Sequence, residues 1–145
     1  MSDADALALL LSQDWGVLSV VGNDGVPYGV PVNYGFLDGK IYIHHTNAAD
    51  SLLSTLLAQN ANVCFTVVGR HEVDEPILST HYDSVIVFGT AAIVTDEVEK
   101  VDAMMKMMTA LAPSMLPNIP SHCQTSRNYL MIVISPSSIT GKRRK

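Results

Sequence analysis

Three runs of β-forming residues lie close together near the start of the chain, separated by very short turns. In order, the runs and the turns between them are residues 16–21, 22–25, 26–36, 38–39 and 40–44. The turns are rich in Gly, Asn and Asp, which accept the positive φ angles of tight turns. Such turns join antiparallel neighbours, because parallel strands need a long crossover. The sequence therefore predicts an antiparallel meander, and Pro27 and Pro31 place an edge strand or a bulge in the second run.

The rest of the chain alternates strand-like and helix-like segments without a regular rhythm. Runs rich in Val and Ile predict strands, and apolar residues at helical spacing predict helices. The expected strands are residues 62–68, 84–95 and 129–135, and the expected helices are residues 3–13, 47–59 and 96–112. The expected cap of the first helix is Ser2 or Asp3. Asn47, with Asp50 in the first turn, and Asp96 are the expected caps of the last two helices. Residues 69–79, which are polar and contain Pro76, and residues 113–120 are expected to be loops.

The order of these elements after the first helix is β-β-β-α-β-β-α-β. Short strands with interposed helices, but without a repeated βαβ unit, favour a closed or partly closed barrel. The length of 145 residues suits one domain without a linker or repeat. We therefore expect a mostly β chain, a six-stranded antiparallel barrel with flanking helices.

The balance of charge argues against nucleic acid as a partner and in favour of a second protein copy. The net charge is −5, so the chain as a whole does not attract polyanions. Charged residues make up only 16%, where about 25% is usual. The low share of charged residues means either that much of the surface is buried in a dimer or that apolar side chains line a ligand site. The basic segment 142–145 is either a solvated tail or a clamp for a phosphate group.

The cysteine and histidine patterns indicate a cytoplasmic protein without a metal site. Cys64 lies in an apolar run and is expected to be a buried small residue, and no C-x-x-C pair is present. The N-terminus lacks the positive region of a signal peptide, and no run of 18 apolar residues predicts a membrane helix. His44 and His45 are adjacent, so they point to opposite faces of a strand, and no H-x-H or H-x-x-x-H spacing predicts a metal.

Several segments resemble the nitroimidazole-reductase (Nim) branch of the pyridoxamine-phosphate-oxidase-like flavoproteins. These segments are residues 28–36, 38–44, 60–68, 82–91 and 139–144, and their order and spacing match as well. The resemblance implies a six-stranded split β-barrel that forms a homodimer with two flavin sites at the interface. It implies flavin mononucleotide (FMN) as the cofactor, with FAD or haem as alternatives.

The resemblance also implies roles for individual residues. The strand with Val32, Asn33 and Tyr34 is expected to pass along the flavin ring, and His44, His45, Thr46 and Ser51 are expected to hold the phosphate. The other residues of the expected cofactor site are Cys64, Phe65, Thr66, Tyr82, Ser84, Val85 and Lys142. Of these, residues 82–85 are expected to come from the second subunit. His71 is the expected catalytic residue, donating a proton near neutral pH to a substrate that the flavin reduces.

Several of these assignments have an alternative that rests on the residues alone. The polar groups of Asn33 and Tyr34 need partners, which are either a flavin or backbone groups of a bulge. His71 is otherwise an exposed loop residue, and Tyr82 is otherwise an interface anchor. Barrels of this kind usually carry a Lys or Arg at the start of the first internal helix, where it contacts the phosphate, whereas residues 48–55 contain no cation here.

Three functions remain open at this stage. The first is a flavin-dependent oxidoreductase that passes hydride from a nicotinamide or another donor to a small aromatic or nitroaromatic acceptor. The second is a non-catalytic barrel that carries flavin, haem or a deazaflavin. The third is a pyridoxamine-phosphate oxidase proper, which ranks last because the chain is short and has no arginine-rich substrate segment.

Overall fold

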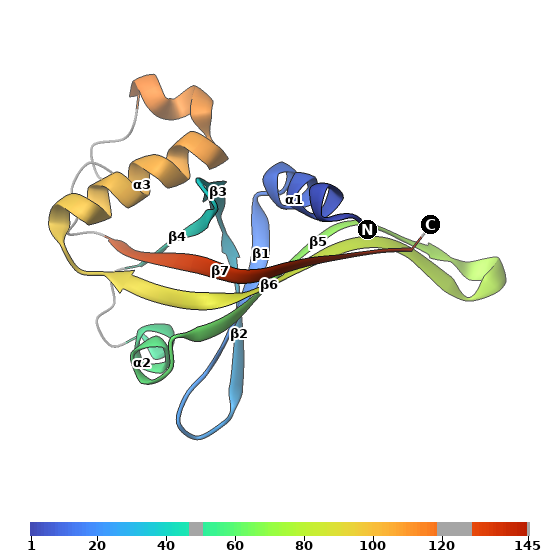
Figure 1. Ribbon diagram of the computed structural model, residues 1–145, viewed down its shortest axis with the longest axis horizontal. Helices are drawn as coiled ribbons and strands as arrows, with labels where there is room; N and C mark the ends of the chain where they lie inside the picture. The colour runs from blue at the N-terminus through green and yellow to red at the C-terminus, as the bar shows by residue number, and fades with distance from the viewer. Residues whose placement is uncertain (47–50, 119–128, 145) are drawn as a thin grey trace.

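A curled antiparallel sheet forms the centre of the computed structural model, which describes residues 1–46, 51–118 and 129–144 (Figure 1). Within these residues the sheet has seven strands in the order β2-β1-β5-β6-β7-β4-β3. The strands are β1 (Trp15–Val21), β2 (Pro27–Asn33), β3 (Gly35–Leu37), β4 (Lys40–Thr46), β5 (Asn62–Asp74), β6 (Ser79–Val94) and β7 (Tyr129–Arg144). The helices are α1 (Asp3–Ser12), α2 (Leu52–Gln59) and α3 (Glu97–Leu111), with short 3₁₀ turns η1 (Glu75–Ile77) and η2 (Pro113–Asn118). The mostly β fold with flanking helices is confirmed.

The two edge strands of the sheet, β2 and β3, are consecutive in the chain. Only Tyr34 separates them, yet β2 pairs with β1 and β3 pairs with β4. The sheet therefore curls until its edges meet at Tyr34, without hydrogen bonds that would close it. The Tyr34 N–H donates to the carbonyl of Asp14, which takes this residue out of the ladder. For that reason the run expected as one strand is two, and the sheet has seven strands rather than six.

The inner face of the sheet carries the main apolar core. Leu18 of β1, Phe65 of β5 and Val85 of β6 are fully buried there, and α1 and α2 contribute Leu10 and Leu53. A second cluster lies between α3 and the strands β4 and β7, and its buried members are Tyr42, Ala103, Met104, Met107, Tyr129 and Met131. The outer face of β1, β5 and β6 lies outside both clusters.

The segment expected as a loop at 69–79 is instead the outer part of a long hairpin. Strands β5 and β6 pair as far as Asp74 and Ser79, with a register shift between Val68 and His71. We call residues 69–82 the β5–β6 arm, which projects beyond the rest of the sheet at the right of Figure 1. The prediction failed because charged residues on a two-stranded ribbon look like a polar loop. Pro76 lies in the turn at its tip, where it disturbs no ladder.

The basic C-terminal segment is also a strand rather than a tail. Lys142 and Arg143 pair with Ser84 and Asp83 on β6, so β7 runs well past its expected end at Ser135. The clamp or tail expected from the sequence is therefore held in the sheet, and Lys145 lies outside the described residues.

The caps of α1 and α3 agree with the sequence, whereas α2 begins at Leu52 with Ser51 as its cap, later than the expected start at residue 47. Ser2 and Asp5 form a capping box on α1, and the Asp96 side chain accepts from the backbone N–H groups of Val98 and Glu99 on α3. Ser51 caps α2, while Asn47 and Asp50 lie outside the described residues. In the described part of the chain, no helix has the length and apolar character needed to cross a bilayer.

Candidate functional site

Cross-strand rows on the outer face of β5, β6 and β7 bring several expected site residues together. Residues directly opposite each other in an antiparallel pair point to the same face. Four rows follow from the pairing: Cys64–Phe88–Ser138, Thr66–Ile86–Thr140, Val68–Ser84–Lys142 and His71–Tyr82–Arg144. The residues between them on β5 and β6, such as Val67 and Val85, are buried on the opposite face. We call this surface the outer sheet face, and six expected residues lie on it: Cys64, Thr66, His71, Tyr82, Ser84 and Lys142.

Large apolar side chains are exposed on this face. Phe88 is 53% exposed, and Trp15 on β1 is 52% exposed. We call the set of exposed apolar residues here the outer apolar patch, and its members are Trp15, Val17, Val68, Ile86 and Phe88. Lys142 Nζ lies 5.9 Å from the centre of the Tyr82 ring, within range of a cation–π contact. The face thus offers an apolar surface with hydroxyl groups and a cation along it, which suits an aromatic ligand that carries a phosphate.

The expected phosphate cradle is described at its two ends. His44 is exposed and His45 is half-buried at the end of β4, where Thr46 pairs with Tyr129. Ser51 is the N-cap of α2, and its Oγ accepts a hydrogen bond from the Ser54 N–H at 3.2 Å. The residues between these ends, 47–50, lie outside the described part, as does the side chain of Thr46.

His44 is a neutral donor in this position rather than a cation. Partial burial lowers the pKa of its imidazole below the ordinary value, and the neighbouring His45 lowers it further. A neutral imidazole donates through a single N–H and carries no charge. At this end of β4, His44 therefore offers a hydrogen bond, and the N-terminus of α2 offers backbone N–H groups and a partial positive charge.

Four expected site residues have their side chains in the core. The side chains of Val32, Tyr34, Phe65 and Val85 are buried in the single chain, and the predicted contact of their strands with a cofactor stays a prediction. The Tyr34 hydroxyl donates to the carbonyl of Leu10 at 2.6 Å, and its ring meets Phe65 edge to face. Burial, followed by the charge of Asp14, raises the pKa of Tyr34 far above its usual range.

Asn33 also finds its partner within the protein. The side chain is exposed, and its Nδ2 donates to the carbonyl of Asp14 at 3.0 Å. Asn33 is therefore not a buried amide, and its predicted contact with a flavin stays a prediction. Together with Tyr34, it is satisfied by backbone carbonyls, which is the alternative that the sequence left open.

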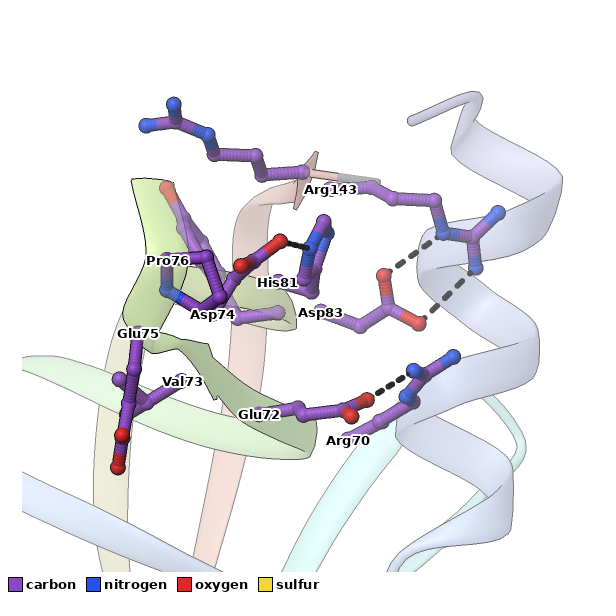
Figure 2. Close-up of a pocket in the computed structure, with 11 residues that line it drawn as sticks. Arg70, Glu72, Val73, Asp74, Glu75, Pro76, His81, Asp83 and Arg143 are labelled. Atoms are coloured by element: carbon purple, nitrogen blue, oxygen red, sulfur yellow. Dashed lines mark hydrogen bonds and ion pairs between the residues drawn. The ribbon is translucent and has the colours of Figure 1, made fainter. Parts of the chain in front are cut away.

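A charged groove beneath the β5–β6 arm was missed in the sequence. Figure 2 shows this cavity of about 880 Å³, which is lined by residues of the arm and of the end of β7. His81 Nε2 lies 3.2 Å from Asp74 Oδ2, Arg143 Nε lies 2.7 Å from Asp83 Oδ1, and Arg70 pairs with Glu72. The alternation of charged residues at 70, 72 and 74 and at 81 and 83 was the signal, because a period of two places them on one face of a ribbon.

The histidine in this groove is His81, whereas the expected catalytic residue His71 is exposed and does not line it. His71 pairs instead with Tyr82 on the outer sheet face. Among the described residues, no group of three or more His, Cys, Asp or Glu side chains is arranged to hold a metal ion. The histidine His122 lies outside those residues.

Comparisons with solved structures identify the fold. A candidate 5-nitroimidazole antibiotic resistance protein from Bacteroides thetaiotaomicron superposes with a TM-score of 0.79 at 21% identity, covering 97% of this chain and 82% of its own. The FAD and haem binding protein from Mycobacterium smegmatis gives 0.81 at 18% identity, with 99% and 72% covered. An FAD-binding protein from Mesorhizobium loti gives 0.73 at 18% identity, with 100% and 96% covered. At these identities the similarity establishes the fold.

A match to a family model shows the family of this chain, which the similar structures alone do not show. No curated protein matches the sequence. The model described as pyridoxamine 5′-phosphate oxidase matches residues 2–143, which is nearly the whole chain. The curled seven-stranded sheet and the segments that resemble the Nim branch agree with this match. The chain therefore belongs to the pyridoxamine 5′-phosphate oxidase family.

Proposed function

We propose that this protein is a cytoplasmic, homodimeric, FMN-dependent reductase that binds the flavin ring against the outer sheet face. The observation that carries the proposal is the row structure of that face, where Thr66, Tyr82, Ser84 and Lys142 accompany exposed apolar side chains. A flavin has a flat ring with an apolar edge, a polar edge and an anionic phosphate, so these residue types fit it. The FAD-binding descriptions of two structural neighbours support the same class of ligand.

A single chain does not bring all the proposed flavin contacts together. The phosphate cradle ends at Thr46, which pairs with Tyr129 at the start of β7, whereas Lys142 lies near its end. At about 3.3 Å per residue, the strand between these positions measures roughly 40 Å. Figure 1 shows β7 running across most of the width of the molecule. A flavin mononucleotide is much shorter, so one flavin takes its cradle and its outer sheet face from two copies of the chain.

In this proposal each residue has a defined task. Ile86 and Phe88 exclude water from one face of the ring, and Ser84 and Thr66 offer hydroxyl groups to its polar edge. Hydride transfer is the chemistry that a bound flavin supplies. His71 lies in the row of Tyr82 on the same face and donates a proton to the reduced substrate. The acceptor is a small aromatic or nitroaromatic compound, in keeping with the nitroimidazole resistance description of one structural neighbour.

The test begins with the visible spectrum of freshly purified protein and titrations with FMN, FAD and haem. Stoichiometric uptake of FMN supports the proposal. Uptake of FAD or haem alone would make that group, rather than FMN, the cofactor. Turnover is then measured with a reduced nicotinamide and a nitroimidazole or a quinone. A protein that binds none of the three cofactors would sink the proposal, and the Lys142→Ala variant, exposed on β7, is expected to weaken FMN binding without loss of fold.

A second candidate is a non-catalytic carrier of flavin, haem or deazaflavin. It is favoured by the absence of a cation from residues 48–55, where relatives of the Nim branch hold the phosphate. Tight binding of a cofactor without turnover of any acceptor supports the carrier, whereas rapid turnover supports the reductase. An assay for oxidation of pyridoxamine 5′-phosphate in the same preparation tests whether this protein has the activity after which the family is named.

A further inference from the structure

The second half of β7 rests on one neighbouring strand. Within the described residues, β4 pairs with β7 up to Ile134, whereas β6 pairs with it as far as Arg144. Residues 135–144 are mostly polar and are half-buried or exposed, so an apolar pattern specifies their place in the sheet only weakly. This segment carries Lys142, the cation of the proposed flavin site. Other contacts must therefore fix its position.

Arg143 lies on the opposite face of β7 from Lys142, because successive side chains of a strand alternate. Its cross-strand partner Asp83 shares the inner face. Arg143 Nε lies 2.7 Å from Asp83 Oδ1 and its Nη2 lies 3.4 Å from Oδ2, and Figure 2 shows both contacts. The two side chains are 33% and 23% exposed, so solvent ions screen this pair less than a fully exposed one. Among the described pairs of β6 with β7, it is the one that joins opposite charges.

Helix α1 gives Arg143 a second partner. Arg143 Nη1 lies 3.7 Å from Asp5 Oδ2. Two residues earlier in β7, a Cβ at Gly141 would lie 2.7 Å from the Cβ of Ala6, so α1 packs directly on the strand there. A shift of β7 by one residue would put a larger side chain against α1 and turn Lys142 to the inner face. Contacts on the inner face thus hold the end of β7 between β6 and α1.

The other arginine pair of the charged groove does not link separate elements. Arg70 pairs with Glu72, two residues away on β5, and their side chains are 71% and 60% exposed. An exposed pair of this kind contributes little to stability. Arg143, by contrast, connects β7 with β6 and with α1. The two arginines line the same groove, so they can be compared directly.

We propose that Arg143 is a positioning residue for the proposed flavin site. From the inner face, its bridge to Asp83 and Asp5 holds the end of β7 in place. On the outer sheet face, Lys142 is thereby kept beside Tyr82, with its Nζ 5.9 Å from the ring centre. The inference rests on the proposed function and adds to it a residue that touches neither flavin nor substrate.

The first test is the FMN dissociation constant of Arg143→Gln and Asp83→Ala. Each change is expected to raise the constant ~5-fold or more, because each breaks the bridge. The two changes alter the net charge in opposite directions, so a general attraction of the anionic phosphate cannot explain a common loss. Arg143→Lys keeps the charge without the planar fork and is expected to retain part of the affinity. Wild-type affinity in both bridge variants would overturn the proposal.

A double-mutant cycle separates positioning from a general loss of stability. If Arg143 acts through Lys142, Arg143→Gln has little further effect on FMN binding in the Lys142→Ala background. Equal losses in both backgrounds would make Arg143 a merely structural residue. Arg70→Gln is the matched control, since it removes the same charge from the same groove and is expected to leave the FMN dissociation constant unchanged.

Amide hydrogen exchange of residues 139–144 tests the bridge without any flavin. Exchange is expected to be faster in Arg143→Gln and Asp83→Ala than in the wild type, and unchanged in Arg70→Gln. If the wild type takes up no FMN, the proposed function and the positioning role fail together. If it takes up FMN and Arg143→Gln matches it in both affinity and exchange, the positioning role alone is refuted.

Discussion

Tyr34 shows how a polar side chain within an apolar run finds its partners inside the protein. It interrupts the edge strand, hydrogen-bonds the carbonyl of Leu10 and packs edge to face on Phe65. In the sequence, a polar aromatic residue within an apolar run is compatible with either a ligand contact or a core hydrogen bond. The distinction depends on where α1 lies, and no local pattern contains that information.

Removing the Tyr34 hydroxyl is expected to reduce stability without affecting the cofactor. Tyr34→Phe leaves the buried Leu10 carbonyl without its side-chain donor, which costs about 1–3 kcal/mol. Urea unfolding of the variant and the wild type measures the difference, and FMN titration of both is expected to give equal affinities. A large loss of FMN affinity with unchanged stability would return Tyr34 to the cofactor site.

His44 is expected to make the stability of the protein depend on pH. The pKa of its imidazole is lower in the folded chain than in the unfolded chain, so the unfolded chain binds more protons as the pH falls through the ordinary histidine range. Stability is therefore complete above about pH 6.5 and declines below it. Melting temperatures at pH 7.5 and 5.5 measure this decline, and His44→Asn is expected to make it smaller. An identical decline in the variant would assign the effect to other groups.

At the scale of elements, the sequence predicted those strands and helices whose apolar residues have a clear spacing. The strands of the core, the caps at Ser2 and Asp96 and the edge position of β2 are confirmed, because burial and turn chemistry act locally. The β5–β6 arm and the end of β7 were missed, since both faces of these ribbons are partly in water and their residues are polar. The expected site residues on the outer sheet face lie together. For those buried in the core, the sequence located the strand but not the face of the sheet on which the side chain lies.

The packing of α3 against β3 depends on the small size of Gly35. A Cβ at Gly35 would lie 2.7 Å from the carbonyl oxygen of Met107 and 3.0 Å from its Cα, and both are backbone atoms that cannot turn aside. Gly35→Ala is expected to cost about 1–3 kcal/mol of stability. Gly29→Ala is the control, because a Cβ there meets its nearest atom at 3.5 Å on an exposed edge strand. Thermal unfolding compares them, and equal melting temperatures would contradict the expected clash.

The length of β7 separates the two parts of the proposed site. The proposed phosphate cradle adjoins one end of β7 through the pair Thr46–Tyr129, and Lys142 lies near the other end. In the proposed homodimer, one copy gives the cradle and the other gives Lys142 to each flavin. Variants that weaken the dimer are therefore expected to weaken FMN binding as well.

Mixing two defective variants tests this directly. Ser51→Asp keeps an N-cap for α2 and places a negative charge at the proposed phosphate cradle, and Lys142→Glu removes the cation from the outer sheet face. Each variant alone is expected to bind FMN poorly, because both sites of its dimer carry the defect.

After mixing and exchange of subunits, half of the dimers contain one copy of each variant. In each of these, one site has both defects and the other has none, so about a quarter of the sites recover wild-type affinity. FMN absorbance after dialysis measures the recovery, and its absence in a mixture with demonstrated subunit exchange would place the whole site within one chain.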